Sequence, residues 1–197
     1  MHLSGLLFVV AAQFIDTLLL SSYFLLISVV FLFYSQYVKS EEKRIHRLLD
    51  KMEEKIRKIA IGLERENIQR PFVGAFWFYF SSALVFLLFP LNIASAAVLI
   101  LAVSDSLSTI VGIKFGKHKV LGNKTLEGII VFFFSGFLSL IFLPFTKAFF
   151  ASTVATFSEI LPEFKNFKRI KETGILDDNW TIPMITATAL YTFTLLT

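Results

Sequence analysis

The chain has 197 residues, of which 55% are hydrophobic, and its formal net charge at pH 7 is +4. Soluble domains are usually about 45–50% apolar, so this composition favours a membrane protein. The absence of cysteine excludes disulfides, thiol nucleophiles and thiolate metal sites, and three scattered histidines argue against a histidine-rich metal centre. We expect one membrane-embedded domain over residues 1–197, because no polar segment is long enough to fold separately.

The first predicted element is the apolar segment Leu3–Val38, whose only charged residue is Asp16. A helix needs about 20 residues to cross the hydrocarbon core, so this segment predicts two passes that turn near Gln13–Asp16. Residues 39–70 follow, with ten Lys or Arg and seven Asp or Glu. Their apolar residues recur at helical spacing, which predicts a cytoplasmic amphipathic helical loop.

Five further passes are predicted downstream, so the expected fold is an all-α, multi-pass transmembrane bundle of about seven helices. Two polar loops, residues 113–126 and 163–180, separate these passes, and a tight turn around Pro90 joins the first two of them. The five segments are 72–90, 91–112, 128–144, 148–161 and 181–196.

The basic residues are distributed very unevenly over this scheme. The loops after the second, fourth and sixth passes hold 18 of the 19 Lys and Arg residues, and Lys147 stands alone on the opposite side. The positive-inside rule therefore places the N-terminus and the three polar loops in the cytoplasm. The expected location is the membrane, the cell membrane in a prokaryote. The net charge is explained by topology, and no nucleic-acid partner is expected.

Two carboxylates, Asp105 and Glu159, lie inside apolar passes. An ionisable group in a bilayer costs several kcal/mol, so each marks a candidate functional site unless it bonds a neighbouring helix for structural reasons. Small and polar residues accompany Asp105 at helical spacing and form one face, which would allow close approach of a helix or a ligand. This face consists of Asp105, Ser108, Thr109, Gly112 and Gly116.

The polar loops carry complementary groups. Four lysines and two glycines between Lys114 and Lys124 suit phosphate binding at a helix end, although positive-inside charge alone would also explain the lysines. Asp177, Asp178 and Asn179 offer hard oxygen ligands of the kind that suit magnesium, or they form a solvated turn. Together these groups indicate a nucleotide or a phosphorylated substrate. Glu163 fits no motif and is expected to be a solvated surface charge.

From Arg70 to the C-terminus the sequence resembles the CTP-dependent lipid kinases, which comprise dolichol kinase, phytol kinase and CTP-dependent diacylglycerol kinase. Their motif D-x-x-A-x-x-x-G-x-x-x-G followed by K-K-T/S-x-E-G is matched by Asp105, Ser108, Gly112, Gly116 and Asn123–Gly128. Ser108 stands where the family has alanine, and Asn123 replaces the first lysine. A later glutamate and a D-D-N-x-x-x-P element are matched by Glu159 and Asp177–Pro183.

The resemblance implies transfer of the γ-phosphate of CTP to the hydroxyl of a lipid alcohol, of a polyprenol, dolichol or other isoprenoid type, with Mg²⁺ as cofactor. It implies that Asp105, Asp177 and Asp178 hold the metal, and that Glu127 or Glu159 handles the hydroxyl proton. Lys124 would contact the phosphates. The implied nucleotide-binding residues are Ser108, Gly112, Gly116, Lys124, Thr125, Gly128 and Asn179. The partners are then CTP, the lipid alcohol and the bilayer, and the oligomeric state is left open.

Two alternatives stay open. A cytidylyltransferase that makes a CDP-lipid would also use CTP, but its longer C-terminal signature is absent from the sequence. A transporter or channel would use Asp105 and Glu159 to bind ions within the membrane, but it would give the loop motifs no role.

The charge distribution makes a direct prediction about topology. Single cysteines introduced as Lys51→Cys, Lys119→Cys and Lys168→Cys should react with an impermeant thiol reagent from the cytoplasmic side, and Lys147→Cys from the other side. The background is clean because the chain has no native cysteine. Labelling of Lys51→Cys and Lys119→Cys from opposite sides would contradict the scheme.

Overall fold

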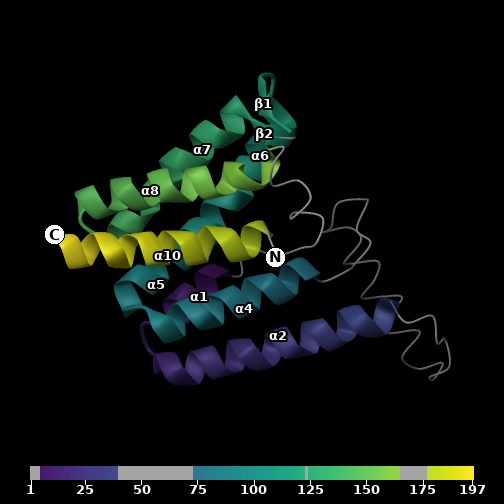
Figure 1. Cartoon of the computed structure of the whole chain (residues 1–197), viewed down its shortest axis with the longest axis vertical. Helices are drawn as coiled ribbons and strands as arrows, with labels where there is room; N and C mark the ends of the chain where they lie inside the picture. The colour runs from purple at the N-terminus through teal and green to yellow at the C-terminus, as the bar shows by residue number, and fades with distance from the viewer. Residues whose placement is uncertain (1–4, 40–72, 123, 165–176) are drawn as a thin grey trace.

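The computed structural model describes residues 5–39, 73–122, 124–164 and 177–197, which are mostly helical (Figure 1). The predicted amphipathic loop therefore lies outside the described residues, apart from its first residue. In chain order the elements are α1 (Gly5–Ala11), α2 (Thr17–Lys39), α4 (Val73–Leu88), α5 (Leu91–Ile100), the π-helical segment η2 (Leu101–Asp105), α6 (Ser106–Phe115), β1 (Lys119–Leu121), β2 (Lys124–Thr125), α7 (Leu126–Gly136), the 3₁₀ segment η3 (Phe137–Ile141), α8 (Phe145–Ile160), the 3₁₀ turn η4 (Leu161–Glu163) and α10 (Asp178–Leu196).

Most of the predicted helices are confirmed, and the first one is corrected. The turn at Gln13–Asp16 is present, and the Asp16 carboxylate starts α2 by accepting hydrogen bonds from the backbone N–H groups of Leu18 and Leu19 at 2.9 and 3.1 Å. However, α1 has only 7 residues. At 1.5 Å per residue it is about 10 Å long, so the prediction of a first pass here is wrong. The antiparallel pair β1–β2 is a second difference from the prediction, which was an all-α fold.

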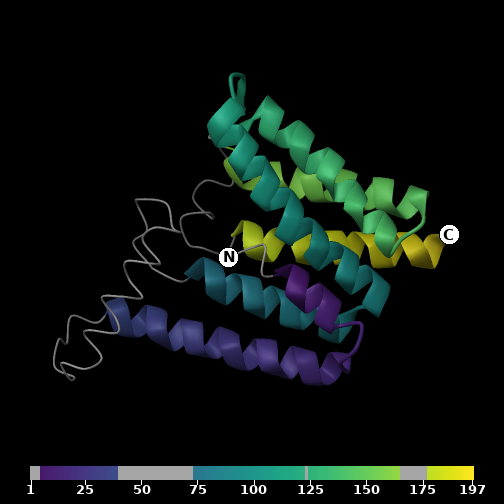
Figure 2. The ribbon, with the colours of Figure 1, turned by 180° about the vertical axis from the view of Figure 1, so that it is seen from behind.

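The helices pack around the continuous helix formed by α5, η2 and α6. Figure 1 shows α10 between α8 and α4, with α2 outside α4, and Figure 2 shows α5 to α6 crossing the rear of the bundle. Every residue of α5 from Ile93 to Ile100 is buried. A helix that is apolar all round belongs in the centre of a core, and its small residues Ala94, Ala96 and Ala97 let neighbouring helices approach closely.

In the part of the chain that the structure describes, two helices are long and apolar enough to cross a membrane, Thr17–Ser35 and Leu91–Phe115. They differ in their surroundings, because 22% of the first and 61% of the second is buried in the protein. Large apolar side chains on α2 point outward, including Leu18, Leu26, Val30 and Phe33, which are 64%, 63%, 58% and 66% exposed. This helix therefore presents an apolar surface that the rest of the described chain does not cover.

Helices α7 and α8 approach each other closely at Gly136, so a substitution there tests how tightly they pack. A Cβ atom at this position would lie 2.5 Å from Ser152 Oγ and 3.0 Å from Ser152 Cβ. The Ser152 hydroxyl donates a hydrogen bond to the Phe133 carbonyl, so it cannot move away without losing this bond.

We expect Gly136→Ala to lower the stability of the protein by about 1–3 kcal/mol, because overpacking forces the two helices apart. The control is Gly74→Ala, where a Cβ would meet its nearest atom, Asn179 Nδ2, at 3.4 Å, an ordinary contact distance. Thermal unfolding of both variants in detergent measures the difference. Equal melting temperatures for the two variants would contradict the tight α7–α8 contact.

Candidate functional site

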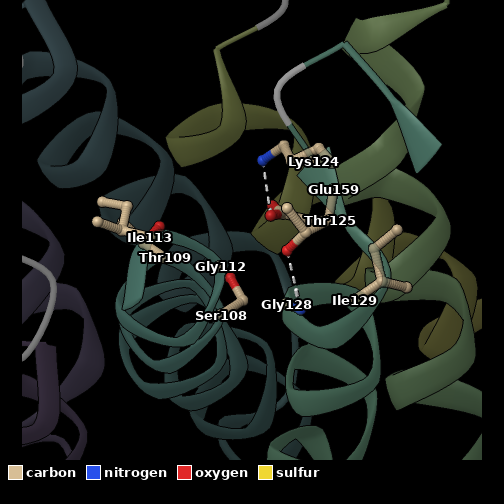
Figure 3. A pocket seen from close by; sticks show the side chains of 9 residues that line it. All are labelled: Ser108, Thr109, Gly112, Ile113, Lys124, Thr125, Gly128, Ile129 and Glu159. Atoms are coloured by element: carbon tan, nitrogen blue, oxygen red, sulfur yellow. Dashed lines mark hydrogen bonds and ion pairs between the residues drawn. The ribbon is translucent and has the colours of Figure 1, made fainter. Parts of the chain in front are cut away.

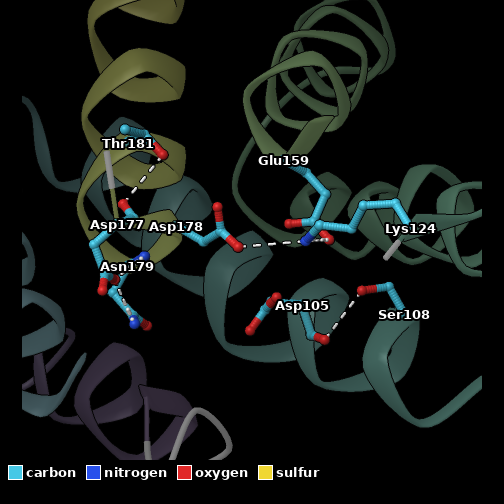
Figure 4. Close-up of polar contacts among 8 residues, drawn as sticks. All are labelled: Asp105, Ser108, Lys124, Glu159, Asp177, Asp178, Asn179 and Thr181. Atoms are coloured by element: carbon cyan, nitrogen blue, oxygen red, sulfur yellow. Dashed lines mark hydrogen bonds and ion pairs between the residues drawn. The ribbon is translucent and has the colours of Figure 1, made fainter. Parts of the chain in front are cut away.

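Four elements bring four charged side chains together at one end of the bundle (Figure 4). Asp105 is the last residue of η2, Lys124 lies on β2, Glu159 is in the last turn of α8, and Asp178 is the first residue of α10. A π-helical turn is uncommon and often occurs at functional sites. The sequence alone predicted an ordinary helix through Asp105, because residue spacing does not reveal a π-helical turn.

The ammonium of Lys124 lies between two carboxylates. Its Nζ is 2.6 Å from Glu159 Oε1 and 3.3 Å from Asp178 Oδ2. Asp105 completes the group, since one carboxylate oxygen from each of Asp105, Glu159 and Asp178 lies within 4.8 Å of the other two. Burial opposes the charged form of Lys124, but the carboxylates of Asp178 and Glu159 outweigh it and raise the pKa of the ammonium above its ordinary value.

These groups are strongly shielded from solvent. The side chains of Lys124 and Glu159 are 18% and 3% exposed, and Asp105 is 9% exposed. Within the described residues, Glu159 Oε2 is buried and has no hydrogen-bond partner. Three carboxylates, of which Asp105 and Glu159 are buried and Asp178 is half-buried, surround one ammonium, and a buried charge needs compensation. The donor set and the unsatisfied oxygen therefore fit a hard divalent cation such as magnesium.

A small pocket lies beside the charged group (Figure 3). Its volume is about 80 Å³, enough for several water molecules. Lys124 and Glu159 lie on its border, so the pocket and the acids form one continuous polar region. The lining residues are Ser108, Thr109, Gly112, Ile113, Lys124, Thr125, Gly128, Ile129 and Glu159. The predicted small face of the Asp105 helix is confirmed here through Ser108, Thr109 and Gly112.

Gly112 and Gly116 let the hairpin formed by β1 and β2 approach α6. A Cβ on Gly116 would lie 2.6 Å from Thr125 Cγ2, and a Cβ on Gly112 would lie 3.2 Å from Thr125 Oγ1. The Thr125 hydroxyl in turn caps α7 by accepting a hydrogen bond from the Gly128 N–H at 3.2 Å. Gly116 and Thr125 thus hold β2 against the bundle, and this contact positions the neighbouring Lys124.

Three residues predicted for the site are not brought to the charged group. Asp177 is the cap of α10, where its Oδ1 accepts hydrogen bonds from the Asn179 backbone N–H and side-chain amide at 2.9 and 2.8 Å. Burial raises the pKa of Asp177 to about 6. The Asn179 carbonyl accepts a hydrogen bond from Ser81 Oγ at 2.6 Å, which joins α10 to α4. Glu127 pairs with His118 at 2.7 Å. In the acid group Glu159 therefore takes the place predicted for Asp177.

Glu163 also differs from its predicted role as a solvated charge. Its side chain is half-buried and lies against Gly122, which has a φ of +55°. Only glycine suits this position, because a side chain would be strained by the backbone angle and would overlap Glu163. Glu163 is therefore unsuitable as a neutral control for substitutions in the site. The exposed Asp16 is a better control residue.

Comparison with known proteins gives one relative and no family. The chain is 40% identical over 93 residues to an uncharacterized protein of Methanocaldococcus jannaschii, a match that covers 46% of this chain and 42% of that protein. No family model matches the sequence, and no solved structure matches it. The assignment of chemistry to the site thus depends on its own geometry and on the motif resemblance.

The acid group predicts cation binding that depends on Asp178. We expect Asp178→Asn to weaken the binding of Mn²⁺, a spectroscopic substitute for Mg²⁺, by tenfold or more, because it removes one of three carboxylate ligands. The control is Asp16→Asn, the same chemical change at an exposed helix cap that asparagine serves equally well. Electron paramagnetic resonance of free Mn²⁺ measures both. Equal affinities in the two variants would show that Asp178 is no ligand.

Proposed function

We propose that this protein is an integral membrane phosphotransferase that moves the γ-phosphate of CTP to the hydroxyl of a lipid alcohol. The observation that supports this most strongly is the placement of Lys124 among Asp105, Glu159 and Asp178, beside a polar pocket. Phosphoryl transfer needs positioning and charge neutralisation more than covalent chemistry, and acids for a metal with a lysine for phosphate supply both. The motif resemblance supplies the donor and the acceptor.

Three features support a multi-pass position in the membrane with the site at its cytoplasmic surface. The outward apolar side chains of α2 suit contact with lipid. Lys147, in the first turn of α8, lies at the end of the bundle opposite the lysine-bearing hairpin (Figure 1). Trp77 and Trp180 have ring centroids 5.6 Å apart near the first turns of α4 and α10, and paired tryptophans are typical of the membrane–water interface. Trp180 lies two residues after Asp178, so this depth is also that of the site.

In the proposed enzyme Asp105, Asp178 and Glu159 Oε1 would hold a magnesium ion, which would neutralise phosphate charge. Lys124 contacts phosphate oxygens, while Ser108 and Gly112 line the space next to it. Glu159 Oε2, the buried oxygen without a hydrogen-bond partner among the described residues, accepts the proton of the acceptor hydroxyl. Glu127 is less suitable as this base, because its carboxylate is paired with His118.

The reaction balances with these groups. The lipid hydroxyl oxygen forms a bond to the γ-phosphorus, the bond from that phosphorus to the β–γ bridging oxygen breaks, and CDP leaves. The hydroxyl proton passes to Glu159. The products are a phosphorylated lipid and CDP, and no oxidant or reductant is required.

A lipid acceptor is supported by an apolar hollow on α10, the helix that begins with Asp178. A hollow of about 330 Å³ lies on α10, lined by Met184, Ile185, Thr188 and Ala189. These residues follow Asp178 by six to eleven positions, which is about 9–16 Å along a helix. A lipid with its hydroxyl at Glu159 could therefore place its chain along α10, within the apolar part of the bundle.

The two alternatives make different demands on the same geometry. An ion carrier would hold its acids near the middle of the membrane, whereas Glu159 lies in the last turn of α8 and Asp178 begins α10. A cytidylyltransferase would use the same cation and nucleotide but break a different bond, and only its products distinguish it.

The test is to incubate the purified protein with labelled CTP, Mg²⁺ and a panel of lipid alcohols. We expect CDP and a phosphorylated lipid, a requirement for Mg²⁺, and a preference for CTP over ATP. Asp178→Asn should lower the rate on the order of a hundredfold, and Asp16→Asn by less than about threefold. Pyrophosphate with a CDP-lipid would identify a cytidylyltransferase, and no turnover of any alcohol would reject the kinase.

A further inference from the structure

We propose that Lys124 is a tethered counter-ion that occupies the cation site until a divalent cation displaces it, and that the displaced ammonium then binds the phosphates of the nucleotide. The first half, exchange between Lys124 and the cation, depends only on the described geometry. The second half, delivery to the nucleotide, rests on the proposed function.

The contacts show that the ammonium and a divalent cation would compete for the same space. Lys124 Nζ lies 2.6 Å from Glu159 Oε1 and 3.3 Å from Asp178 Oδ2, and these two residues also supply two of the three clustered carboxylates. Magnesium binds oxygen at about 2.0–2.1 Å. An ion held by the same two carboxylates would therefore press against the ammonium, and two positive charges in direct contact in a shielded site repel strongly.

The charge balance explains why a divalent cation should replace the Lys124 ammonium. Three carboxylates at this separation repel one another, and Lys124 offsets one negative charge of the three. If Lys124 left without replacement, the buried Glu159 would lose the ammonium that it contacts at 2.6 Å while two other acids stay close to it, which is costly. A divalent cation offsets two charges and can take Glu159 Oε1 from Lys124, beside the buried Oε2 that has no hydrogen-bond partner among the described residues. Displacement is thus favourable only when the ion enters.

The structure also provides a place for the displaced ammonium. Lys124 lies on the border of the 80 Å³ pocket together with Ser108, Gly112 and Thr125 (Figure 3). Its side chain has four flexible carbon atoms, so rotation alone can move Nζ from the acids into the pocket. β2 need not move, since Thr125 holds it against α6 and α7. An ammonium freed in this way lies beside the cation, where the phosphates of a bound nucleotide would be.

Two consequences follow for binding. Without a cation the ammonium is held by Glu159 and Asp178, so a free nucleotide finds no available positive charge among the described residues that line the pocket. Without a nucleotide the ammonium opposes the cation, so the ion alone binds weakly. The site should therefore prefer the cation–nucleotide complex over either component, with Lys124 as the residue that couples the two.

The test measures Mn²⁺ binding without nucleotide, and then binding of the Mn²⁺–CTP complex, in the wild-type protein and in Lys124→Met. We expect Lys124→Met to bind Mn²⁺ alone about tenfold more tightly and Mn²⁺–CTP about tenfold more weakly. Lys124→Arg should keep the weak Mn²⁺ binding because it keeps the charge. The control is Lys147→Met in the first turn of α8, far along the helix from Glu159 in its last turn, and its loss should change neither affinity.

Each outcome bears on a separate part of the proposal. Unchanged or weaker Mn²⁺ binding by Lys124→Met would overturn the exchange. Tighter Mn²⁺ binding with unchanged affinity for Mn²⁺–CTP would support the exchange and overturn the delivery. If Lys124→Met unfolds easily, Mn²⁺ should raise its melting temperature more than that of the wild-type protein, and an equal rise would also overturn the exchange. None of these measurements needs turnover, so a failure of the kinase assay would reject the proposed function separately.

Discussion

The compensation of buried charge is the constraint on which the rest of this structure depends. Asp105 and Glu159 lie in helices that are otherwise apolar, and such acids are tolerated only where opposite charge reaches them. Lys124 supplies that charge from a hairpin that is distant in the sequence from both acids. The four elements η2, β2, α8 and α10 must therefore meet at one point, and this meeting point determines where α8 ends and where α10 begins.

The small residues of the bundle serve this convergence. Gly112 and Gly116 leave room for Thr125, so the hairpin can lie against α6, and the Thr125 hydroxyl then starts α7. The motif glycines thus act on the site through the placement of Lys124. The motif resemblance predicts that these glycines let the backbone approach a nucleotide. In the structure they let β2 approach α6, and the pocket lies beside this contact, bordered by Ser108, Thr109 and Lys124.

Much of the fold and part of the site could be predicted from the sequence, for identifiable reasons. Long apolar segments broken by Pro90 and by the polar loops located most helices correctly, since hydropathy and turn residues act locally. Asp105 and Glu159 stood out because charge in an apolar context is rare, and Lys124 and Asp178 stood out through the motifs of the polar loops. The first pass was predicted wrongly although its turn was located correctly, because the apolar segment before the turn is too short for a helix that crosses a bilayer. In α1 the chain turns after seven residues, and Gln13 fixes the turn by donating hydrogen bonds to Val9 and Ser95.

The errors at Asp177 and Asn179 share one cause, which is that capping and ligand binding use the same side chains. Asp177 and Asn179 have the oxygen atoms that a metal or nucleotide would require. However, the first N–H groups of α10 need a hydrogen-bond acceptor, and the Asp177 carboxylate accepts from the Asn179 N–H. Asp178, one residue further on, is left to face Lys124. The start of α10 thus divides the adjacent acids between the helix cap and the charged group around Lys124, and a helix boundary shifted by one residue would exchange the two. Sequence patterns locate such a boundary only to within a few residues, whereas the ligand set depends on the exact register.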